Sequence, residues 1–439
     1  MSLLNKFKSD PLFVKALRSS GALFSANTFA LGLSVLQGMM ATRLLGPAGF
    51  GLLGIVMAFA STINSLFSFR MGEVVVRYGG EYLAKAEKEK AAALIKAAAL
   101  TEAAVSLLAF LVALLTAHFA ETYLAKTSGI AWMFAAFAFG LLANFNAETS
   151  IGILQITDKI KLQGVINLIQ SILTTLVITG AFFLDGGIVI VLIAYLIGKS
   201  ILGLGLFLAA QIQLRRALGA GWAKTPLTAL AAWREIAAFA LHSNISATLI
   251  KLFRESELIW IGLFLNAAAV GYYRVAFTLV SFLAIPADPL IAVTFPELNR
   301  LAVEKNWARL KNFLKKITAF SAAYNAALAA ILILFGGWAI QIYAGAEYRP
   351  AYPALAALTI GLAFNYALFW NRPLLLALGQ PKFPVYATLA AGVVKLALSF
   401  WLVPRYGILA AGALLSFYYI SSVGGMALRG VKQIIKDEG

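Results

Sequence analysis

Runs of about 20 apolar residues recur along the whole 439-residue chain. An α-helix of that length crosses a hydrocarbon core about 30 Å thick. Because lipid offers the backbone no hydrogen-bond partner, such runs are expected to be helices. The pattern therefore predicts an all-α integral membrane protein of about twelve transmembrane helices. We place them near 21–42, 49–69, 97–117, 130–153, 162–184, 188–211, 235–264, 270–291, 317–343, 353–377, 384–402 and 407–427.

The second six predicted helices repeat the first six in the same order. An offset of 220 residues superposes Leu45 and Gly51 on Leu265 and Gly271. In each half a helix, a short turn and a second helix precede a long, charged, amphipathic loop. Two parallel repeats are typical of transporters whose substrate site lies between the halves and which work by alternating access.

The repeat and a polar linker predict where the chain divides. The linker contains Gly219, Gly221 and Pro226, which suit a hinge. A basic segment with apolar positions at helical spacing precedes the first long run and predicts an interfacial helix. We expect an N-terminal six-helix lobe with this interfacial helix at 1–213, a cytoplasmic linker at 214–232 and a C-terminal six-helix lobe at 233–439.

Composition agrees with a membrane protein, since 61% of the residues are hydrophobic and 13% are charged. Soluble domains average roughly 45–50% apolar and 25% charged residues. The net charge of +17 does not indicate nucleic acid, because no soluble basic module is present to bind it. Of the 36 Lys and Arg residues, 26 fall in the termini and loops of one side, 4 on the other side and 6 inside helices. By the positive-inside rule, both termini are predicted to be cytoplasmic.

The sequence gives little support to an enzyme. The chain has no cysteine and two histidines, His118 and His242, so it cannot form a metal centre from those residues. It has no GxxxxGK[ST] loop for ATP. The longest loop on the outer side, near 118–129, is too short for a catalytic module. We therefore expect neither enzymatic activity nor a bound cofactor.

Three segments resemble the polysaccharide exporter and O-antigen flippase (Wzx-type) family. This family belongs to the superfamily of multidrug, oligosaccharidyl-lipid and polysaccharide exporters. The segments are "ATRLLGPAGFGLLGIVMAF" at 41–59, "NAAAVGYYRVAFTLVSFLAIPADPLIAVTFPELNRL" at 266–301 and "LLLALGQPKFPVYATLAAGVVKLALSFWLVPRYGILAAGALLS" at 374–416. The resemblance extends over essentially the whole chain, and the three segments occur in the family's order and spacing.

The resemblance implies a V-shaped exporter in the inner (cytoplasmic) membrane. Members of this family flip polyprenyl-diphosphate-linked oligosaccharides from the cytoplasmic to the outer leaflet. The implied partners are the lipid-linked oligosaccharide, membrane lipids and glycan polymerase or ligase machinery. Two other functions stay open, namely a cation-coupled multidrug or small-molecule exporter of the same superfamily and a non-transporting membrane partner of a glycan assembly complex.

Charged residues inside the predicted helices are the candidate functional residues. A charge near the bilayer centre costs roughly 2.5–3.5 kcal/mol, so such residues usually face a cavity or a partner. Arginine suits phosphate oxygens through its fork of donors, and lysine acts as a point charge. The candidates for the cavity and the diphosphate are Lys199, Lys251, Arg254, Arg274, Arg372 and Lys395. The candidates for coupling transport to H⁺ or Na⁺ are Glu148, Glu255 and Glu257.

Two interpretations of the seventh predicted helix remain. Lys251 and Glu255 are four residues apart, and Arg254 and Glu257 are three apart, so both can form pairs within the helix. Alternatively, the two cations line a cavity and take the diphosphate. Arg274 has a further alternative, since it lies about one turn from the outer surface, where its side chain could reach the interface.

Overall fold

The computed structural model describes residues 11–438 apart from 231–232, 239, 241–247, 249–250, 254–255 and 286. Side chains are described from Asn27 onward within these ranges, with the further exception of residues 287–289, 292–293 and 437. Every regular element in these ranges is a helix, and no strand occurs in them. The interfacial helix expected at the N-terminus begins in residues that lie outside the described part of the chain.

Eight of the described helical segments are long and apolar enough to cross a membrane. They are Asn27–Phe67, Lys88–Ala125, Lys161–Phe183, Ile188–Leu218, Ala267–Ala284, Trp307–Tyr343, Ala346–Ala377 and Lys382–Lys436. The first lies in α2 (Pro11–Phe67) and the last in α17 (Lys382–Glu438), and each of these helices is divided by a kink. The kinks fall at the turns expected between the first two and the last two predicted helices. The all-helical membrane fold is thus confirmed.

Glycine stands at both kinks because the backbone there is left-handed. The φ angle is 62° at Gly46 and 63° at Gly407. A residue with a side chain would lose roughly 1–2 kcal/mol in this conformation. Pro47 follows the first kink directly, at a helix start where its missing N–H has no cost.

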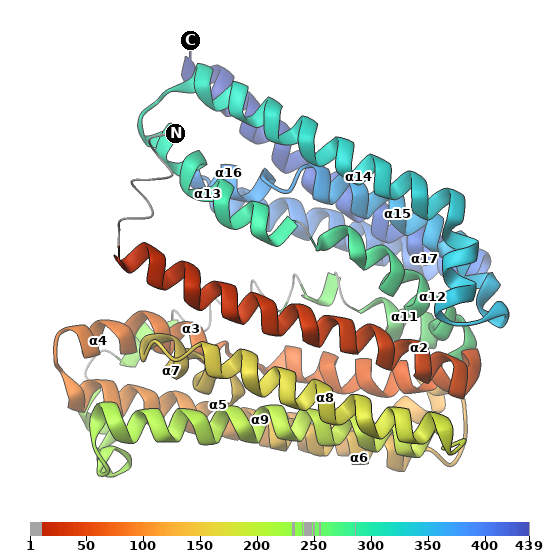
Figure 1. Ribbon diagram of the computed structural model, residues 1–439, viewed down its shortest axis with the longest axis horizontal. Coiled ribbons are helices and arrows are strands. Elements are labelled where there is room, and N and C mark those ends of the chain that lie inside the picture. The colour runs from red at the N-terminus through yellow and green to blue at the C-terminus, as the bar shows by residue number, and fades with distance from the viewer. Residues whose placement is uncertain are drawn as a thin grey trace. The chain divides into compact units, whose positions relative to one another are not determined.

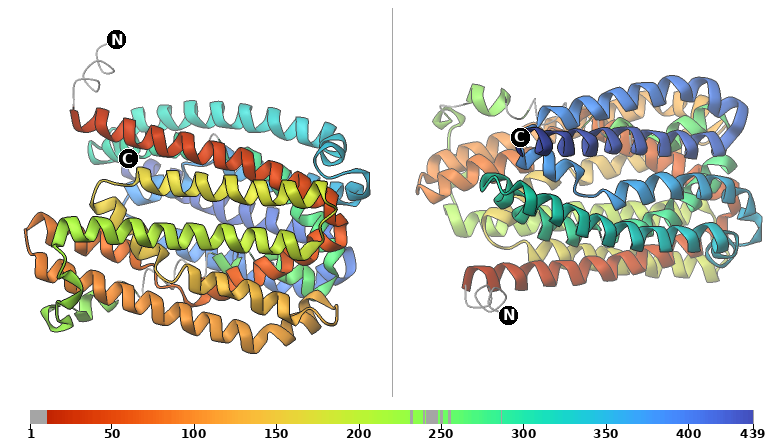
Figure 2. Two further views of the ribbon diagram at one scale, coloured as in Figure 1. Left: turned by 60° about the horizontal axis from the view of Figure 1, so that its bottom comes forward. Right: turned by 90° about the horizontal axis from the view of Figure 1, so that it is seen from above.

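One compact unit consists of Met1–Leu45, Phe59–Thr122 and Thr127–Thr248. Its long helices are the first part of α2, α5 (Lys88–Phe119), α8 (Lys161–Phe183) and α9 (Ile188–Leu218). Figures 1 and 2 show α8 and α9 side by side. The shorter elements are α3 (Met71–Val74), η1 (Val75–Gly79), α4 (Gly80–Ala84), η2 (Ala120–Ala125), α6 (Ala131–Ala143), α7 (Ala147–Ile156), η3 (Trp222–Lys224) and η4 (Leu227–Ala229).

The fourth expected helix, near 130–153, is broken in the structure into α6 and α7. Between them, the Asn144 side chain donates to the carbonyls of Gly140 at 2.8 Å and Lys199 at 3.1 Å. Asn146, which is buried, stands at the N-terminal cap of α7. Short polar side chains compete with the helical hydrogen bonds of the backbone, and this accounts for the break. A helix N-terminus therefore lies inside a segment that was expected to be one continuous span.

The other compact unit consists of Gly46–Ala58, Tyr123–Lys126 and Leu249–Gly439. Within it, α15 packs along both α14 and α17. Its further elements are α11 (Glu257–Phe264), α12 (Ala267–Val280), η5 (Ser281–Ala284), α13 (Ala287–Val303), α14 (Trp307–Tyr343), η6 (Ala346–Ala351), α15 (Tyr352–Ala367) and α16 (Asn371–Ala377). The expected division of the chain at 213 and 233 stays a prediction.

Two glycines bring α12 close to the segment Gly46–Ala58. A Cβ atom on Gly51 would lie 1.7 Å from the carbonyl oxygen of Ala267. A Cβ atom on Gly271 would lie 2.2 Å from the carbonyl oxygen of Pro47. Neither distance is possible for a real Cβ, so this contact between backbones requires glycine at both positions.

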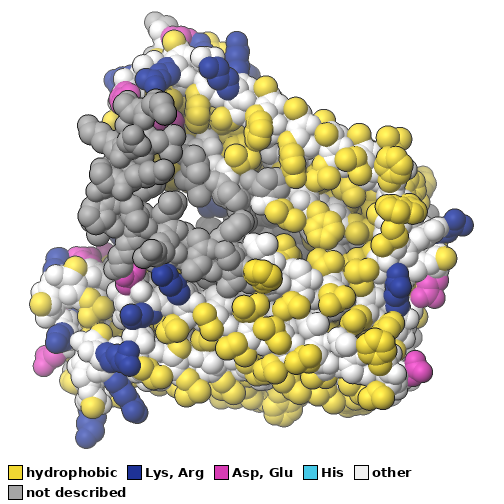
Figure 3. Space-filling model, viewed as in Figure 1, with side chains coloured by type: hydrophobic (Ala, Val, Ile, Leu, Met, Phe, Trp, Pro, Cys, Tyr) yellow, Lys and Arg dark blue, Asp and Glu magenta, His cyan; other side chains and the backbone are white. Residues whose placement is uncertain are grey.

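The surfaces of the helices match a lipid environment. Large apolar side chains follow the outer face of α5, where Leu107, Leu111 and Leu115 are exposed. Similar rows occur on α8 and α14. Figure 3 shows apolar side chains along the helices and charged side chains gathered near helix ends. In water, apolar patches of this extent would promote aggregation, whereas in a bilayer they contact the apolar lipid chains.

Candidate functional site

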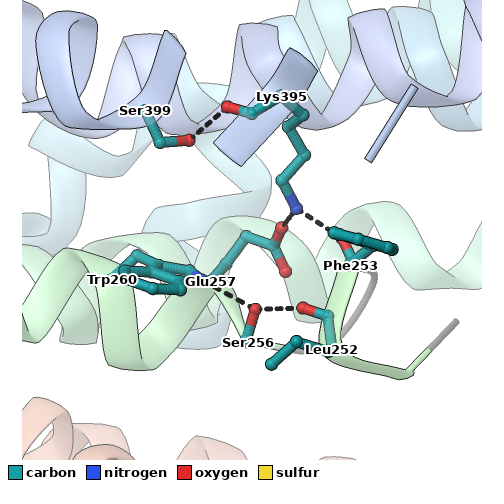
Figure 4. Close-up of polar contacts among 7 residues, drawn as sticks. All are labelled: Leu252, Phe253, Ser256, Glu257, Trp260, Lys395 and Ser399. Carbon is teal, nitrogen blue, oxygen red and sulfur yellow. Dashed lines mark hydrogen bonds and ion pairs between the residues drawn. The ribbon is translucent and has the colours of Figure 1, made fainter. Parts of the chain in front are cut away.

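The strongest charged contact inside the helices is a buried ion pair between α11 and α17 (Figure 4). The Lys395 ammonium contacts a carboxylate oxygen of Glu257 and donates to the carbonyl of Phe253. The two charged side chains are 2% and 8% exposed. The ammonium also lies 5.7 Å from the centre of the Tyr418 ring. Each charge in this pair thus has its partner inside one unit.

Small residues and side-chain hydrogen bonds shape this pair (Figure 4). Gly392 lies one turn before Lys395, and a Cβ there would come 2.3 Å from the Phe253 ring. The Ser256 hydroxyl donates to the Leu252 carbonyl and accepts from Trp260 Nε1 at 2.8 Å. These side chains bond the carbonyl of Leu252 and the ring nitrogen of Trp260, on either side of the start of α11.

The expected pairs within the seventh predicted helix fall partly outside the description. Arg254 and Glu255 lie outside the described residues. The carboxylate of Glu257 contacts Lys395, which is 138 residues away in sequence. Lys251 is half-buried. The alternative of a Lys251–Glu255 pair stays a prediction.

Arg274, on α12, packs against the segment Gly46–Ala58 of the same unit. Its guanidinium carbon lies 4.2 Å from the centre of the Phe50 ring. Nη1 donates to the Phe50 carbonyl at 3.4 Å, and Nη2 lies 3.7 Å from the Met57 sulfur. Gly54 leaves room for it, since a Cβ there would lie 3.3 Å from Arg274 Cδ. These contacts fix a half-buried cation without themselves supplying an opposite charge.

Lys199, on α9, occupies a similar environment in the other unit. Its aliphatic chain crosses Gly140, where a Cβ would lie 3.1 Å from Lys199 Cδ. The ammonium lies 5.6 Å from the centre of the Phe137 ring. Its side chain is half-buried. Both Lys199 and Arg274 therefore lie across a glycine with their charge over an aromatic ring.

Glu148 lies at the helix break, in the first turn of α7, and its side chain is exposed. It lines a cavity of about 300 Å³ together with Glu73 and Arg77. A second carboxylate, Glu102 of α5, accepts the backbone N–H groups of Glu148 and Thr149, both at 2.9 Å. Glu102 thus caps the positive N-terminus of α7.

The remaining candidate is placed differently. Arg372 is the second residue of α16, and its side chain is exposed. Together these placements divide the described candidates between the units: Lys199 and Glu148 lie in one, and Lys251, Glu257, Arg274, Arg372 and Lys395 in the other. The roles of these residues in binding cargo or ions stay predictions.

Sequence reasoning missed Glu102 and Phe50. Glu102 interrupts the apolar run near 97–117, and a lone carboxylate in such a run was a usable signal. Phe50 gave no signal, because an aromatic residue near a span end is ordinary. Only the packing of α12 identifies it as the ring beneath Arg274.

Comparison with solved structures identifies the fold. A multidrug resistance MATE family transporter of the MOP superfamily, solved in an inward-facing conformation, aligns with a TM-score of 0.74 and 14% identity over 93% of this chain and 95% of that one. The lipid II flippase MurJ, in an inward closed conformation, aligns with a TM-score of 0.71 and 14% identity over 94% and 89%. The fold is therefore that of the MOP-superfamily membrane transporters.

The family follows from sequence comparison. A family model described as "Polysaccharide biosynthesis protein" matches residues 16–302, so the chain belongs to that family. One relative is the inner membrane protein YghQ of Escherichia coli (strain K12), which is 24% identical over 345 residues. That alignment covers 78% of this chain and 96% of YghQ. The resemblance to polysaccharide exporters in sequence is thus confirmed.

Proposed function

We propose that this chain flips a polyprenyl-diphosphate-linked oligosaccharide from the cytoplasmic to the outer leaflet of the inner membrane. It does so by alternating access of its two units, with both termini in the cytoplasm, and without catalysing a reaction. Membership of a polysaccharide biosynthesis family supports a saccharide cargo. The fold shared with a lipid II flippase supports a lipid-linked one.

The observation that carries the proposal is the position of Arg274. Arg274 is half-buried on a membrane-spanning helix, where a charged side chain usually faces a cavity or a partner. Its fork of donors matches two oxygens of a phosphate. The Phe50 ring and carbonyl hold it in one orientation, so little entropy is lost when an anion binds. Lys199, in the other unit, is likewise a cation set over an aromatic ring.

Lys395 and Glu257 have a different role in this proposal. Their charges neutralise one another inside one unit, and the ammonium is also bonded to the Phe253 carbonyl. A diphosphate could reach Lys395 only by displacing Glu257. We therefore assign the diphosphate to Arg274, keep Lys199 of the other unit as a separate candidate, and treat Lys395 and Glu257 as a pair that fastens α11 to α17. Lys251 and Arg372 remain secondary candidates.

Coupling to an ion is part of the same proposal. Glu148, exposed in a cavity at a helix break, is the candidate for H⁺ or Na⁺. Contacts with glycan polymerase or ligase machinery are expected from the family resemblance alone.

The test is transport of a labelled polyprenyl-diphosphate saccharide by purified protein in liposomes. Removing a charge-assisted hydrogen bond loses roughly 1.5–3 kcal/mol, so Arg274→Ala should slow flipping about ten- to hundredfold. Lys199→Ala should also slow it. The matched control is Arg405→Ala, which removes an exposed arginine that lies 4.6 Å over the Trp401 ring. Its rate should stay within about twofold of wild type.

Each result has a distinct meaning. Normal flipping by Arg274→Ala would keep the function but remove the cationic site. Absence of flipping by the wild type, together with export of a cationic dye, would overturn the proposal in favour of a multidrug exporter. Absence of both would favour a non-transporting partner of glycan assembly.

A further inference from the structure

An uncharged polar cavity lies within one unit, among α2, α8 and α9. Its volume is about 380 Å³, within the range of roughly 300–1,000 Å³ found for small-molecule sites. Most of its lining residues carry an amide or hydroxyl group, and none carries a charge. They are Asn27, Ala30, Leu31, Ser34, Gln37, Asn167, Gln170, Ser171, Thr174 and Tyr195.

The polar residues share one face of each helix. On α8, Asn167, Gln170, Ser171 and Thr174 follow the spacing of three and four residues that aligns side chains. From Asn167 to Thr174 the lining extends about 10 Å along the helix axis at 1.5 Å per residue. Opposite it, α2 contributes from Asn27 to Gln37, a rise of about 15 Å. The cavity is therefore an elongated cleft inside membrane-spanning helices.

Part of the network fastens helices together. The Gln37 side chain, 4% exposed, donates to the Ser171 carbonyl at 3.0 Å and to the Thr175 hydroxyl at 2.9 Å. Asn167 donates to Asn27 at 3.1 Å. Amide bonds of this kind join helices in membranes. These bonds account for the buried amide of Gln37, but they do not involve every polar group that lines the cavity.

Thr174 is the clearest of these groups. Its side chain is 2% exposed, and among the described residues its hydroxyl has no hydrogen-bond partner. The hydroxyl points toward Gly198 of α9, where a Cβ would lie 2.2 Å from Thr174 Oγ1. A buried hydroxyl without a partner costs roughly 1–3 kcal/mol in proteins. Gln170 and Ser34 line the same cavity.

We propose that this cavity is the glycan subsite of the transporter, which binds uncharged sugar units of the cargo. This inference rests on the proposed function. Neutral amides and hydroxyls can donate to and accept from sugar hydroxyls, whereas a diphosphate or a cationic drug would find no opposite charge here. The ring of Tyr195 offers an apolar surface for a sugar ring. The charged groups proposed for the diphosphate thus do not belong to this cavity.

The chain has no cysteine, so single cysteines report on the cavity directly. Ser34→Cys and Gln170→Cys line the cavity, and Leu36→Cys and Ile172→Cys, two residues further on the same helices, are exposed on another face. Only a thiolate reacts with a charged methanethiosulfonate reagent, and a thiol in lipid does not ionise. Cavity cysteines should therefore react at least tenfold faster than the controls. Equal reaction rates at all four positions would overturn the proposal.

The ligand is then tested with two probes. One is free oligosaccharide released from the lipid-linked pool of the source organism, and the other is undecaprenyl diphosphate without sugar. The oligosaccharide at millimolar concentration should slow labelling of Ser34→Cys and Gln170→Cys severalfold, and the bare lipid should not. Slowing by the bare lipid alone, or by neither probe, would overturn a glycan subsite.

A blocking variant separates this inference from the proposed function. Ser34→Trp fills the cavity at an exposed position and should reduce flipping of the glycosylated lipid at least tenfold while leaving the bare lipid unaffected. Leu36→Trp should leave both unaffected. Equal loss of both lipids in Ser34→Trp would overturn the subsite. If the wild type flips neither lipid yet the oligosaccharide protects the cysteines, the proposed function fails and the glycan site stands.

Discussion

Lys395 and Glu257 form an ion pair in the interior of this protein. Each is almost fully buried, and each satisfies the other. Taking two ions out of water costs several kcal/mol per ion, and their attraction with good geometry offsets that cost. Removing one partner therefore deprives the other, buried charge of this ion pair.

We expect Lys395→Met to lower the free energy of unfolding by about 3–5 kcal/mol, because Glu257 then loses its counter-ion. The melting temperature of the purified protein in detergent reports this. The double variant Lys395→Met/Glu257→Leu should recover most of the loss, since apolar replacement of a whole pair is often neutral. The control is Lys311→Met, whose partner Glu438 is 40% exposed, with an expected change under about 1 kcal/mol. Equal effects of Lys395→Met and Lys311→Met would contradict the pair.

At this scale the sequence predicts which charges are unusual but not what they contact. Lys199, Arg274 and Lys395 stand out because their neighbours are apolar. Their contacts depend on helices far away in sequence, as with Lys395 and Glu257, 138 residues apart. Local spacing suggests only pairs within one helix, whereas Glu257 also contacts Lys395 on another.

Among the elements, the break between α6 and α7 exposes a helix N-terminus. Backbone N–H groups at such an end need acceptors, and Glu102 supplies both carboxylate oxygens. The carboxylate also suits the partial positive charge of the helix end. The cap ties α5 to α7 at the position of Glu148.

Glu102→Ala should loosen this helix start. Loss of a capping side chain costs about 0.5–2 kcal/mol, which corresponds to roughly two- to thirtyfold faster amide exchange where opening is local. Hydrogen–deuterium exchange of peptides containing Glu148 and Thr149 measures it. Glu89→Ala, at an exposed position in the first turn of the same helix α5, should leave that exchange unchanged. Unchanged exchange in Glu102→Ala would show that the cap does not hold α7.

Gly51 tests the contact between α12 and the segment Gly46–Ala58. Gly51→Ala forces a methyl group into the Ala267 carbonyl and should cost about 1–3 kcal/mol by overpacking. Gly32→Ala is the control on the same helix α2, since a Cβ there meets nothing within 4 Å. Alanine favours helix over glycine by about 1 kcal/mol, so this control should be neutral or stabilising. Melting temperatures that move together for both variants would contradict the close approach.

Helix positions were more predictable than helix continuity. Long apolar runs and the glycines at 46 and 407 indicate spans and turns, because lipid dictates helices and left-handed backbone dictates glycine. The break at Asn144 to Asn146 was not predicted, because two asparagines in an apolar run are also compatible with side chains that bond a neighbouring helix.

For the whole molecule, the distribution of Lys and Arg predicts orientation. Single cysteines at Lys85 and Lys382 should react with a membrane-impermeant maleimide only after cells are permeabilised. Cysteines at Ser128 and Arg405 should react in intact cells. All four positions are exposed, so burial does not confound the comparison. The reverse pattern would invert the proposed topology.

The glycine contact also has a consequence for the origin of the chain. Gly51 contacts Ala267, and Gly271 contacts Pro47. The two glycines are 220 residues apart, and so are Pro47 and Ala267. Such reciprocity is the mark of an isologous interface, in which a residue and its own copy exchange partners across a two-fold axis. It is the contact expected if a half-length ancestor assembled as a homodimer before its gene was duplicated and fused.

Arg274 departs from this reciprocity. Its counterpart 220 residues earlier is Gly54, the residue that leaves room for it. In a homodimer, both copies would carry arginine and the two guanidinium groups would compete for one space, or both would carry glycine and leave a gap. Gly54→Arg should consequently melt lower than wild type, because Arg274 already fills the space beside Gly54. One of the two related positions thus leaves a space, and the other places a positive charge in it.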